Sequence, residues 1–122
     1  MAATVVLTER AVRDIREIER FSKVQWGRKT ADKYLDDIES ALDRLSKNPV
    51  LLRNEPEITA NVSLYRVRRH MLVCDYRDKI LVVLTVIHSV MDLPARLAEL
   101  APNLATEAQL LREKLHGRHR SN

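Results

Sequence analysis

Three arginines in one short segment are the side chains best suited to handling phosphate. Arg66 and Arg68 alternate with Tyr65 and Val67 in a β-rich run, and Arg69 follows directly. Alternation along a strand places both guanidiniums on one face. A guanidinium offers a planar pair of donors that matches a phosphate group. The alternative is a solvated strand face, because one side of a one-sided sheet is normally polar. The segment is therefore a candidate surface for phosphate or target binding.

Two histidines stand at the edges of the β-rich runs, His70 and His88. A histidine titrates near neutral pH, so either one could serve as a general acid or base. The alternative is a histidine at a strand end that is bonded to the backbone. His116 and His119 share a helical spacing, but no carboxylate pattern joins them into a metal site. With only two glycines in the chain there is no phosphate loop, and we expect no metal and no cofactor.

The charge balance is basic, with 21 Lys and Arg residues against 17 Asp and Glu residues and a formal net charge of +4. A basic surface suits an acidic partner, which could be nucleic acid, an acidic protein or an anionic membrane. Plain solubility is the alternative explanation. The length of 122 residues fits one domain, and the hydrophobic fraction of 45% is enough for a core.

The single cysteine, Cys74, excludes an internal disulfide and is expected to be a small buried apolar residue. No N-terminal stretch has the order of a signal peptide. The longest nearly apolar run, residues 80–87, is far shorter than the roughly 20 residues that span a bilayer. We therefore expect a cytoplasmic protein that does not cross a membrane.

Two amphipathic helices are expected near the N-terminus, at residues 9–24 and 28–47. Thr8 can cap the first helix. Apolar residues repeat at intervals of three and four through the second helix, the clearest periodicity in the chain. Gly27 breaks the pattern between the helices, and Asn48-Pro49 ends the second one. The short link makes them an antiparallel hairpin.

The β-rich runs predict a small antiparallel sheet. The last run is apolar on both faces, which is typical of a central strand covered on both sides. The two residues Arg77-Asp78 are short enough to link the last two strands as a hairpin. The segment 50–61 follows Pro49, contains Pro56 and shows little periodicity, so it is predicted to be a loop. The expected strands are residues 4–7, 62–68, 70–76 and 79–88.

The C-terminal part predicts two short helices. Asp92 would cap a helix at residues 93–100, and Thr106 with Gln109 would form the capping box of a second helix at 106–115. The fold class is therefore α+β: an N-terminal strand, an antiparallel helix hairpin packed on a small antiparallel sheet, and short C-terminal helices. We expect a main domain at residues 1–100 and a helical extension with a basic tail at 101–122.

The ordered set of local sequences resembles the RelE/ParE superfamily of toxins from type II toxin–antitoxin systems, closer to the ParE (plasmid stabilisation) branch. The resemblance covers about residues 5–100. No single piece is specific, whereas the order of the pieces is. The matching pieces are Leu7-Thr8-Glu9-Arg10-Ala11-Val12-Arg13-Asp14-Ile15; Ala31, Tyr34 and Leu35; Leu45-Ser46-Lys47-Asn48-Pro49; Tyr65-Arg66-Val67-Arg68; and Val86-Ile87-His88-Ser89-Val90-Met91-Asp92.

The resemblance implies a bacterial toxin that a cognate antitoxin neutralises in a heteromeric complex. The antitoxin would lay an apolar helix or strand into the groove between the helix hairpin and the sheet. The candidate contacts are Trp26, Tyr34, Leu35 and Ile38. For the last three residues the alternative is that they form the core of the hairpin.

The superfamily suggests two activities. RelE-like members cut messenger RNA in the ribosomal A site, and ParE-like members poison DNA gyrase. A metal-independent endoribonuclease would use Arg66, Arg68 and His88, but its further basic positions fall near Met71 and Val90, which cannot stabilise the charge of a phosphorane. The sequence therefore favours a gyrase inhibitor that is not an enzyme. The alternatives are a ribosome-dependent endonuclease and a non-toxic binding domain with the same fold.

Overall fold

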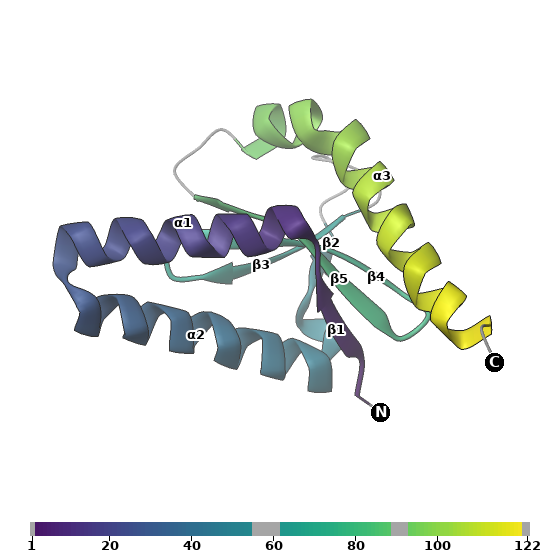
Figure 1. Cartoon of the computed structure of the whole chain (residues 1–122), viewed down its shortest axis with the longest axis horizontal. Helices are drawn as coiled ribbons and strands as arrows, with labels where there is room; N and C mark the ends of the chain where they lie inside the picture. Colours follow the sequence, from purple (N-terminus) through teal and green to yellow (C-terminus); the bar gives the residue numbers. More distant parts are fainter. Residues whose placement is uncertain (1, 55–61, 89–92, 121–122) are drawn as a thin grey trace.

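A five-stranded sheet lies between two helical layers in the computed structural model, which describes residues 2–54, 62–88 and 93–120. The helix hairpin covers one face of the sheet and the C-terminal helix crosses the other (Figure 1). The elements in chain order are β1 (Thr4–Leu7), α1 (Glu9–Trp26), α2 (Arg28–Lys47), the 3₁₀ turn η1 (Pro49–Leu51), β2 (Arg53–Asn54), β3 (Ser63–Val67), β4 (His70–Arg77), β5 (Ile80–His88) and α3 (Leu93–Arg120).

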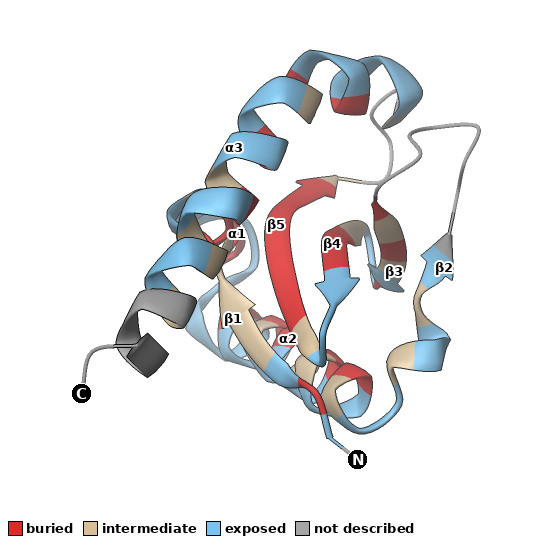
Figure 2. Ribbon diagram, turned by 90° about the vertical axis from the view of Figure 1, so that its right-hand side faces the viewer, coloured by how far each residue is buried: buried red, intermediate tan, exposed pale blue. Residues whose placement is uncertain are grey.

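The sheet has the strand order β1-β5-β4-β3-β2. β1 runs parallel to β5, whereas the other neighbouring strands are antiparallel, so the sheet is mixed where antiparallel pairing alone was expected. The parallel pair forms because the helix hairpin carries the chain away from β1 before the meander begins. β5 lies inside the sheet between β1 and β4 and is buried along most of its length (Figure 2), which confirms the expectation of a strand covered on both faces.

The turn between β4 and β5 consists of Asp78 and Lys79, one residue later than the expected Arg77-Asp78 link. Both turn residues have positive φ, 53° and 63°. Two successive residues of positive φ form a turn whose twist matches that of a β-hairpin. Arg77 therefore stays in β4 and pairs with Ile80.

Both hairpin helices begin and end close to where the sequence predicts. The Thr8 hydroxyl accepts a hydrogen bond from the Ala11 amide at 3.1 Å, which confirms the expected cap of α1. α2 has the predicted bounds, because Gly27 adopts a φ of 91° before it and Asn48 leaves helical geometry ahead of Pro49.

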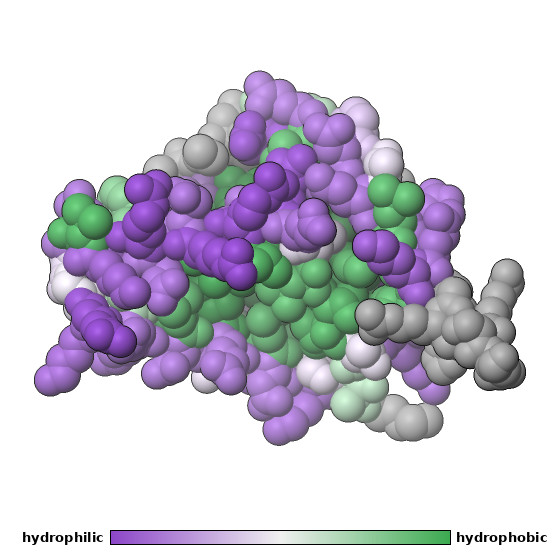
Figure 3. Space-filling view, viewed as in Figure 1, coloured by the Kyte–Doolittle hydropathy of each residue, from purple (hydrophilic) through white to green (hydrophobic). Residues whose placement is uncertain are grey.

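Two apolar clusters hold the layers together. One lies between the sheet and the hairpin, and the other between the sheet and α3. Apolar surface remains visible as a hollowed band between α1 and α2 and over β1 (Figure 3). Half-buried side chains that pack at the edge of the hairpin cluster are Val5, Leu7, Ile15 and Leu42.

The C-terminal part is one helix of 28 residues, in place of the two short helices expected. Leu97, Leu100, Leu104 and Ala108 form a continuous buried stripe at helical spacing, and their burial offsets the cost of Pro102, roughly 3 kcal/mol in a helix interior. Thr106 lies inside the helix and donates to the Pro102 carbonyl at 3.0 Å, so the proposed capping box was wrong.

The break predicted at residue 100 falls inside α3. Asp92, the expected cap, lies outside the described residues. None of the described helices combines the length and the apolar character that a bilayer crossing requires.

Candidate functional site

Tyr34, His70 and His88 form one contact cluster at the end of the sheet, which we call the histidine cluster. His70 and His88 are register partners on β4 and β5, with ring centroids 4.9 Å apart. Tyr34 reaches His70 from α2, with its ring edge-on to the imidazole. The structure thus joins one residue proposed for antitoxin binding with the two histidines proposed for acid–base chemistry.

Tyr34 is the hydrogen-bond partner of His70. The Arg69 amide donates to the Tyr34 hydroxyl at 3.2 Å, and the same hydroxyl forms a hydrogen bond with His70 Nδ1 at 2.5 Å. Burial and the neighbouring His88 lower the pKa of His70 to about 4. At neutral pH His70 is therefore an uncharged, weak base.

Arg68 is held against α2 by two contacts. Its guanidinium forms an ion pair with Asp37 and lies over the Tyr34 ring, 5.3 Å from the centroid. Arg68 itself occupies the turn between β3 and β4, with a φ of 52°. This arginine serves the packing of the turn on the helix hairpin, because its charge is already matched by a carboxylate.

Arg66 and Arg68 do not share a face as the alternation predicted. β3 ends at Val67, so Arg68 belongs to a turn and points to the hairpin. Arg66 lies on the face of Leu64, which packs toward α3, and its Nε donates to the Arg68 carbonyl at 2.9 Å. Arg69 is also exposed. Arg66 and Arg68 therefore lie on different sides of the sheet and do not form one cradle.

A bulge in β5 places His88 beside His70. Val73 pairs with Thr85 but Cys74 pairs with Val83, so β5 contains one extra residue, Leu84. The extra residue reverses the alternation of β5 beyond it. Without the reversal His88 would face α3, away from Tyr34.

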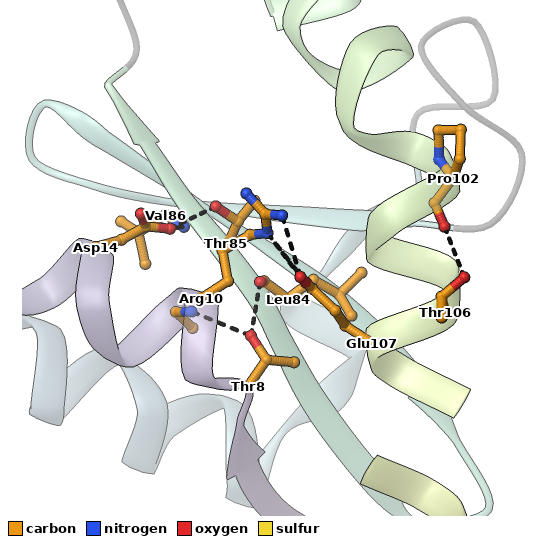
Figure 4. A network of polar contacts seen from close by, with 10 residues as sticks. Thr8, Arg10, Asp14, Leu84, Thr85, Val86, Pro102, Thr106 and Glu107 are labelled. Atoms are coloured by element: carbon orange, nitrogen blue, oxygen red, sulfur yellow. Dashed lines mark hydrogen bonds and ion pairs between the residues drawn. The ribbon is translucent and has the colours of Figure 1, made fainter. Parts of the chain in front are cut away.

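Side chains of α1 and of its cap hold this bulged edge (Figure 4). Beyond the end of β1, the Thr8 hydroxyl donates to the Leu84 carbonyl at 2.8 Å. Asp14 accepts from the Thr85 hydroxyl at 2.5 Å and from the Val86 amide at 3.0 Å. Backbone groups that no strand pairs are thus satisfied by α1. In the sequence, only its place on the helix marks Asp14, and nothing there indicates this role.

Two arginines, Arg10 and Arg112, connect α3 to the rest of the fold. Arg10 of α1 forms a bidentate pair with Glu107, with both of its shortest contacts at 3.0 Å, and the hydrogen bonds to Glu107 raise the pKa of Arg10. Arg112 donates to the carbonyls of Asp75 and Ile80 at 3.0 and 3.3 Å. α3 is therefore fixed to both α1 and the sheet.

The four residues proposed for antitoxin binding separate by burial. Tyr34 and Ile38 are 8% and 3% exposed and belong to the hairpin core. Leu35 is half-buried, and Trp26 at the end of α1 is 55% exposed. Only Leu35 and Trp26 of the four retain substantial surface for a partner.

An exposed apolar group next to Trp26 was not foreseen. Phe21 is 57% exposed and its ring meets that of Trp26 edge to face at a centroid distance of 5.8 Å. Val24 between them is 77% exposed. In the sequence, Phe21, Val24 and Trp26 share one feature, which is that each is an apolar residue outside the buried stripe of α1. Periodicity alone does not show whether such a residue has a role.

Residues able to bind a metal do not gather in the part of the chain that the structure describes. No group of three His, Cys, Asp or Glu side chains there lies close enough to hold an ion. The side chains of His116 and His119 lie outside what the structure describes.

Solved structures with the same arrangement of strands and helices come from toxin–antitoxin systems. A chain of the chromosomal ParDE system from Pseudomonas aeruginosa matches with a TM-score of 0.63 and 17% identity, over 71% of this chain and 96% of that one. A chain of the RelBE2 toxin–antitoxin complex from Mycobacterium tuberculosis matches with a TM-score of 0.53 and 22% identity, over 72% and 99%. The chain thus shares its fold with these two chains of toxin–antitoxin systems.

Comparison at the level of sequence shows which family of proteins with this fold the chain matches. Toxin ParE of Escherichia coli is 27% identical over 95 residues, which span 77% of this chain and 92% of that protein. The family model for the ParE toxin of the type II toxin–antitoxin system parDE matches residues 5–93. The chain belongs to this ParE toxin family, and most of α3 lies beyond the matched residues.

Proposed function

We propose that the chain is a toxin that inhibits DNA gyrase and is neutralised by a cognate antitoxin in the bacterial cytoplasm. The observation that carries the choice of target is the state of the histidine cluster. The guanidinium that lies over Tyr34, that of Arg68, is paired with Asp37, and His70 is neutral with a pKa of about 4. The membership in the ParE family supports the same choice.

RNA cleavage needs more than this cluster supplies. A general base and acid must act beside cations that stabilise a phosphorane. Arg66 lies across the sheet from the histidines, and its register partner is the apolar Met71. A base of pKa about 4 is also poorly matched to proton transfer at neutral pH. These features favour a toxin that acts by docking on its target.

We place the antitoxin on the outer face of the helix hairpin. The hollowed apolar band between α1 and α2 (Figure 3) offers a groove for an apolar helix or strand. Half-buried side chains such as Ile15 and Leu42 pack against the core cluster between the hairpin and the sheet. Leu35 and the exposed Trp26 are the proposed contacts, and Tyr34 and Ile38 support them from the core.

A paired assay tests the choice of target. Purified chain is added to gyrase with relaxed plasmid, and separately to programmed ribosomes carrying messenger RNA. We expect inhibited supercoiling and intact RNA. RNA cleavage that disappears in the Arg66→Ala/His88→Ala double variant would instead establish the endonuclease.

The proposed target-binding arginines can be tested in the same gyrase assay. Arg66→Ala and Arg69→Ala should weaken inhibition, while Arg16→Ala, an exposed arginine of α1, serves as the matched control. Equal inhibition by all three variants would show that Arg66 and Arg69 do not belong to the surface that binds the target.

A further inference from the structure

The linked ends of α1 and α2 expose an apolar cluster that the core does not use. Phe21, Val24 and Trp26, which we call the hairpin tip, are 57%, 77% and 55% exposed. Phe21 and Trp26 contact each other with ring centroids 5.8 Å apart. Aromatic residues held this far out of the core contribute little to folding, and an exposed apolar cluster of this kind marks an interaction site.

The shape of the hairpin presents this cluster to a partner. α1 and α2 extend past the ends of the strands, so the tip projects from the body of the molecule (Figure 1). Gly27 makes the sharp link between the helices, and no heavy atom lies within 4 Å of the position its Cβ would take. A narrow convex projection of this kind fits into a concave surface.

The charged residues around the hairpin tip indicate the charge expected on the partner's surface. Residues 20–33 contain five Lys and Arg residues and one Asp. Arg20 and Lys23 have ion-pair partners one turn earlier in α1, Glu17 and Glu19, but these pairs are exposed and weak. The segment around the hairpin tip therefore carries a net positive charge.

The start of α2 reverses the usual electrostatics of a helix. Helix N-termini favour negative side chains because the first amides point outward with partial positive charge. α1 follows this rule with Thr8 and Glu9, whereas α2 has no side-chain cap and no acidic residue in its first turn. Its first residues are instead the exposed Arg28 and Lys29. This arrangement costs stability in the free chain, and acidic side chains of a partner would offset that cost.

We propose that the hairpin tip is the surface that docks on the toxin's target protein, in an apolar groove with an acidic rim. Tryptophan and arginine are among the residues that most often dominate binding energy at protein interfaces, and here Trp26 and Arg28 stand on either side of Gly27. The inference rests on the proposed function, because it assigns the tip to the target of the toxin. Trp26 also borders the surface we assign to the antitoxin, so an antitoxin bound there would mask the tip.

Two variants separate binding from folding. Phe21→Ala/Trp26→Ala removes the aromatic pair, and we expect it to raise the concentration needed for half-inhibition by about tenfold or more. Arg28→Glu/Lys29→Glu reverses the charge, and we expect the same loss of activity together with an unchanged or higher melting temperature, because acidic residues suit a helix N-terminus. A purely structural role could not lower activity while maintaining or raising stability.

Matched controls exist elsewhere on the surface. Val50→Ala/Leu51→Ala removes two exposed apolar side chains from η1. Arg16→Glu/Arg53→Glu makes the same change of net charge at exposed sites away from the tip. Both controls should retain the activity of the unmodified chain.

Growth arrest after induced expression and inhibition of purified gyrase are measured for every variant. Arrest by the unmodified chain that the tip variants lose and the controls keep supports the inference. If that pattern holds while purified gyrase is unaffected, the tip is supported and gyrase is rejected as the target. Tip variants as active as the unmodified chain, or an unmodified chain that does not arrest growth, overturn the inference.

Other occupants of the tip give different results. Light scattering that shows a dimer broken by the tip variants would assign the tip to a second copy of the chain. Loss of binding to a fluorescent single-stranded oligonucleotide, with gyrase inhibition retained, would assign it to nucleic acid. Either result overturns the proposal of a target-protein surface.

Discussion

Truncation of Leu104 tests whether α3 is an integral layer of the fold. Leu104 is 2% exposed and lies in the cluster between α3 and the sheet. α3 lies almost wholly beyond the residues that the family model matches. Leu104→Ala leaves the helix backbone and its propensity intact, so its effect reports the packing of α3 on the sheet.

The expected loss follows from burial. Leucine-to-alanine changes at fully buried sites cost about 3 kcal/mol, because the transfer energy of the removed atoms is lost and a cavity remains. Leu110 on the same helix is 55% exposed, and its truncation should cost less than about 1 kcal/mol. For a domain of this size, the Leu104 change corresponds to a melting temperature lower by about 10 °C.

Urea titration followed by circular dichroism measures both free energies of unfolding. If α3 packs on the sheet, the free energies of unfolding of the Leu104→Ala and Leu110→Ala variants should differ by roughly 2 kcal/mol or more. Equal, small losses for the two variants would refute the docking of α3 on the sheet.

Three further predictions concern the site and the sheet. The pKa of His70 is lowered to about 4, so the stability that neutral His70 contributes is fully present above pH 6.5 and should be lost as the pH falls from 6.5 to 4. His70→Gln should flatten the stability–pH profile between pH 6.5 and 4. An unchanged slope in this variant would contradict the lowered pKa. Cys74 is fully buried with its pKa raised to about 12, so a thiol reagent at pH 8 should react only on unfolding; labelling at the rate of a free thiol would count against the buried site. Asp14→Ala should cost about 2 kcal/mol in urea unfolding because the Val86 amide loses its acceptor, whereas the exposed Arg13→Ala should cost under about 0.5 kcal/mol; similar values for both would reject the edge-capping role.

Local signals sufficed for the helix hairpin. Gly27 and Asn48-Pro49 bound α2 through backbone restrictions that act within a few residues. The same holds for the Thr8 cap. Such signals do not depend on the rest of the fold, which is why the predicted bounds agree with the structure.

Features that depend on distant residues were not predictable in this way. The parallel pairing of Thr4 with Ile80 joins segments far apart in the chain, and no local pattern encodes it. The bulge at Leu84 depends on acceptors and donors supplied by α1, and it alone brings His88 to His70. The histidine cluster therefore emerges from tertiary structure.

Pro102 lies between the two short helices predicted for the C-terminal part, but it does not interrupt α3. A proline predicts a break because it removes an amide donor and crowds the preceding turn. In α3 the helix continues because buried leucines on both sides of Pro102 hold it on the sheet. A single sequence shows the local cost of proline but not the tertiary burial that offsets it.

Supercoiling of relaxed plasmid by purified gyrase is the decisive assay for the proposal that this toxin docks on gyrase. We expect folded chain at a molar excess to block the appearance of supercoiled plasmid in proportion to its concentration. Normal supercoiling at a large excess of folded chain would refute the proposal.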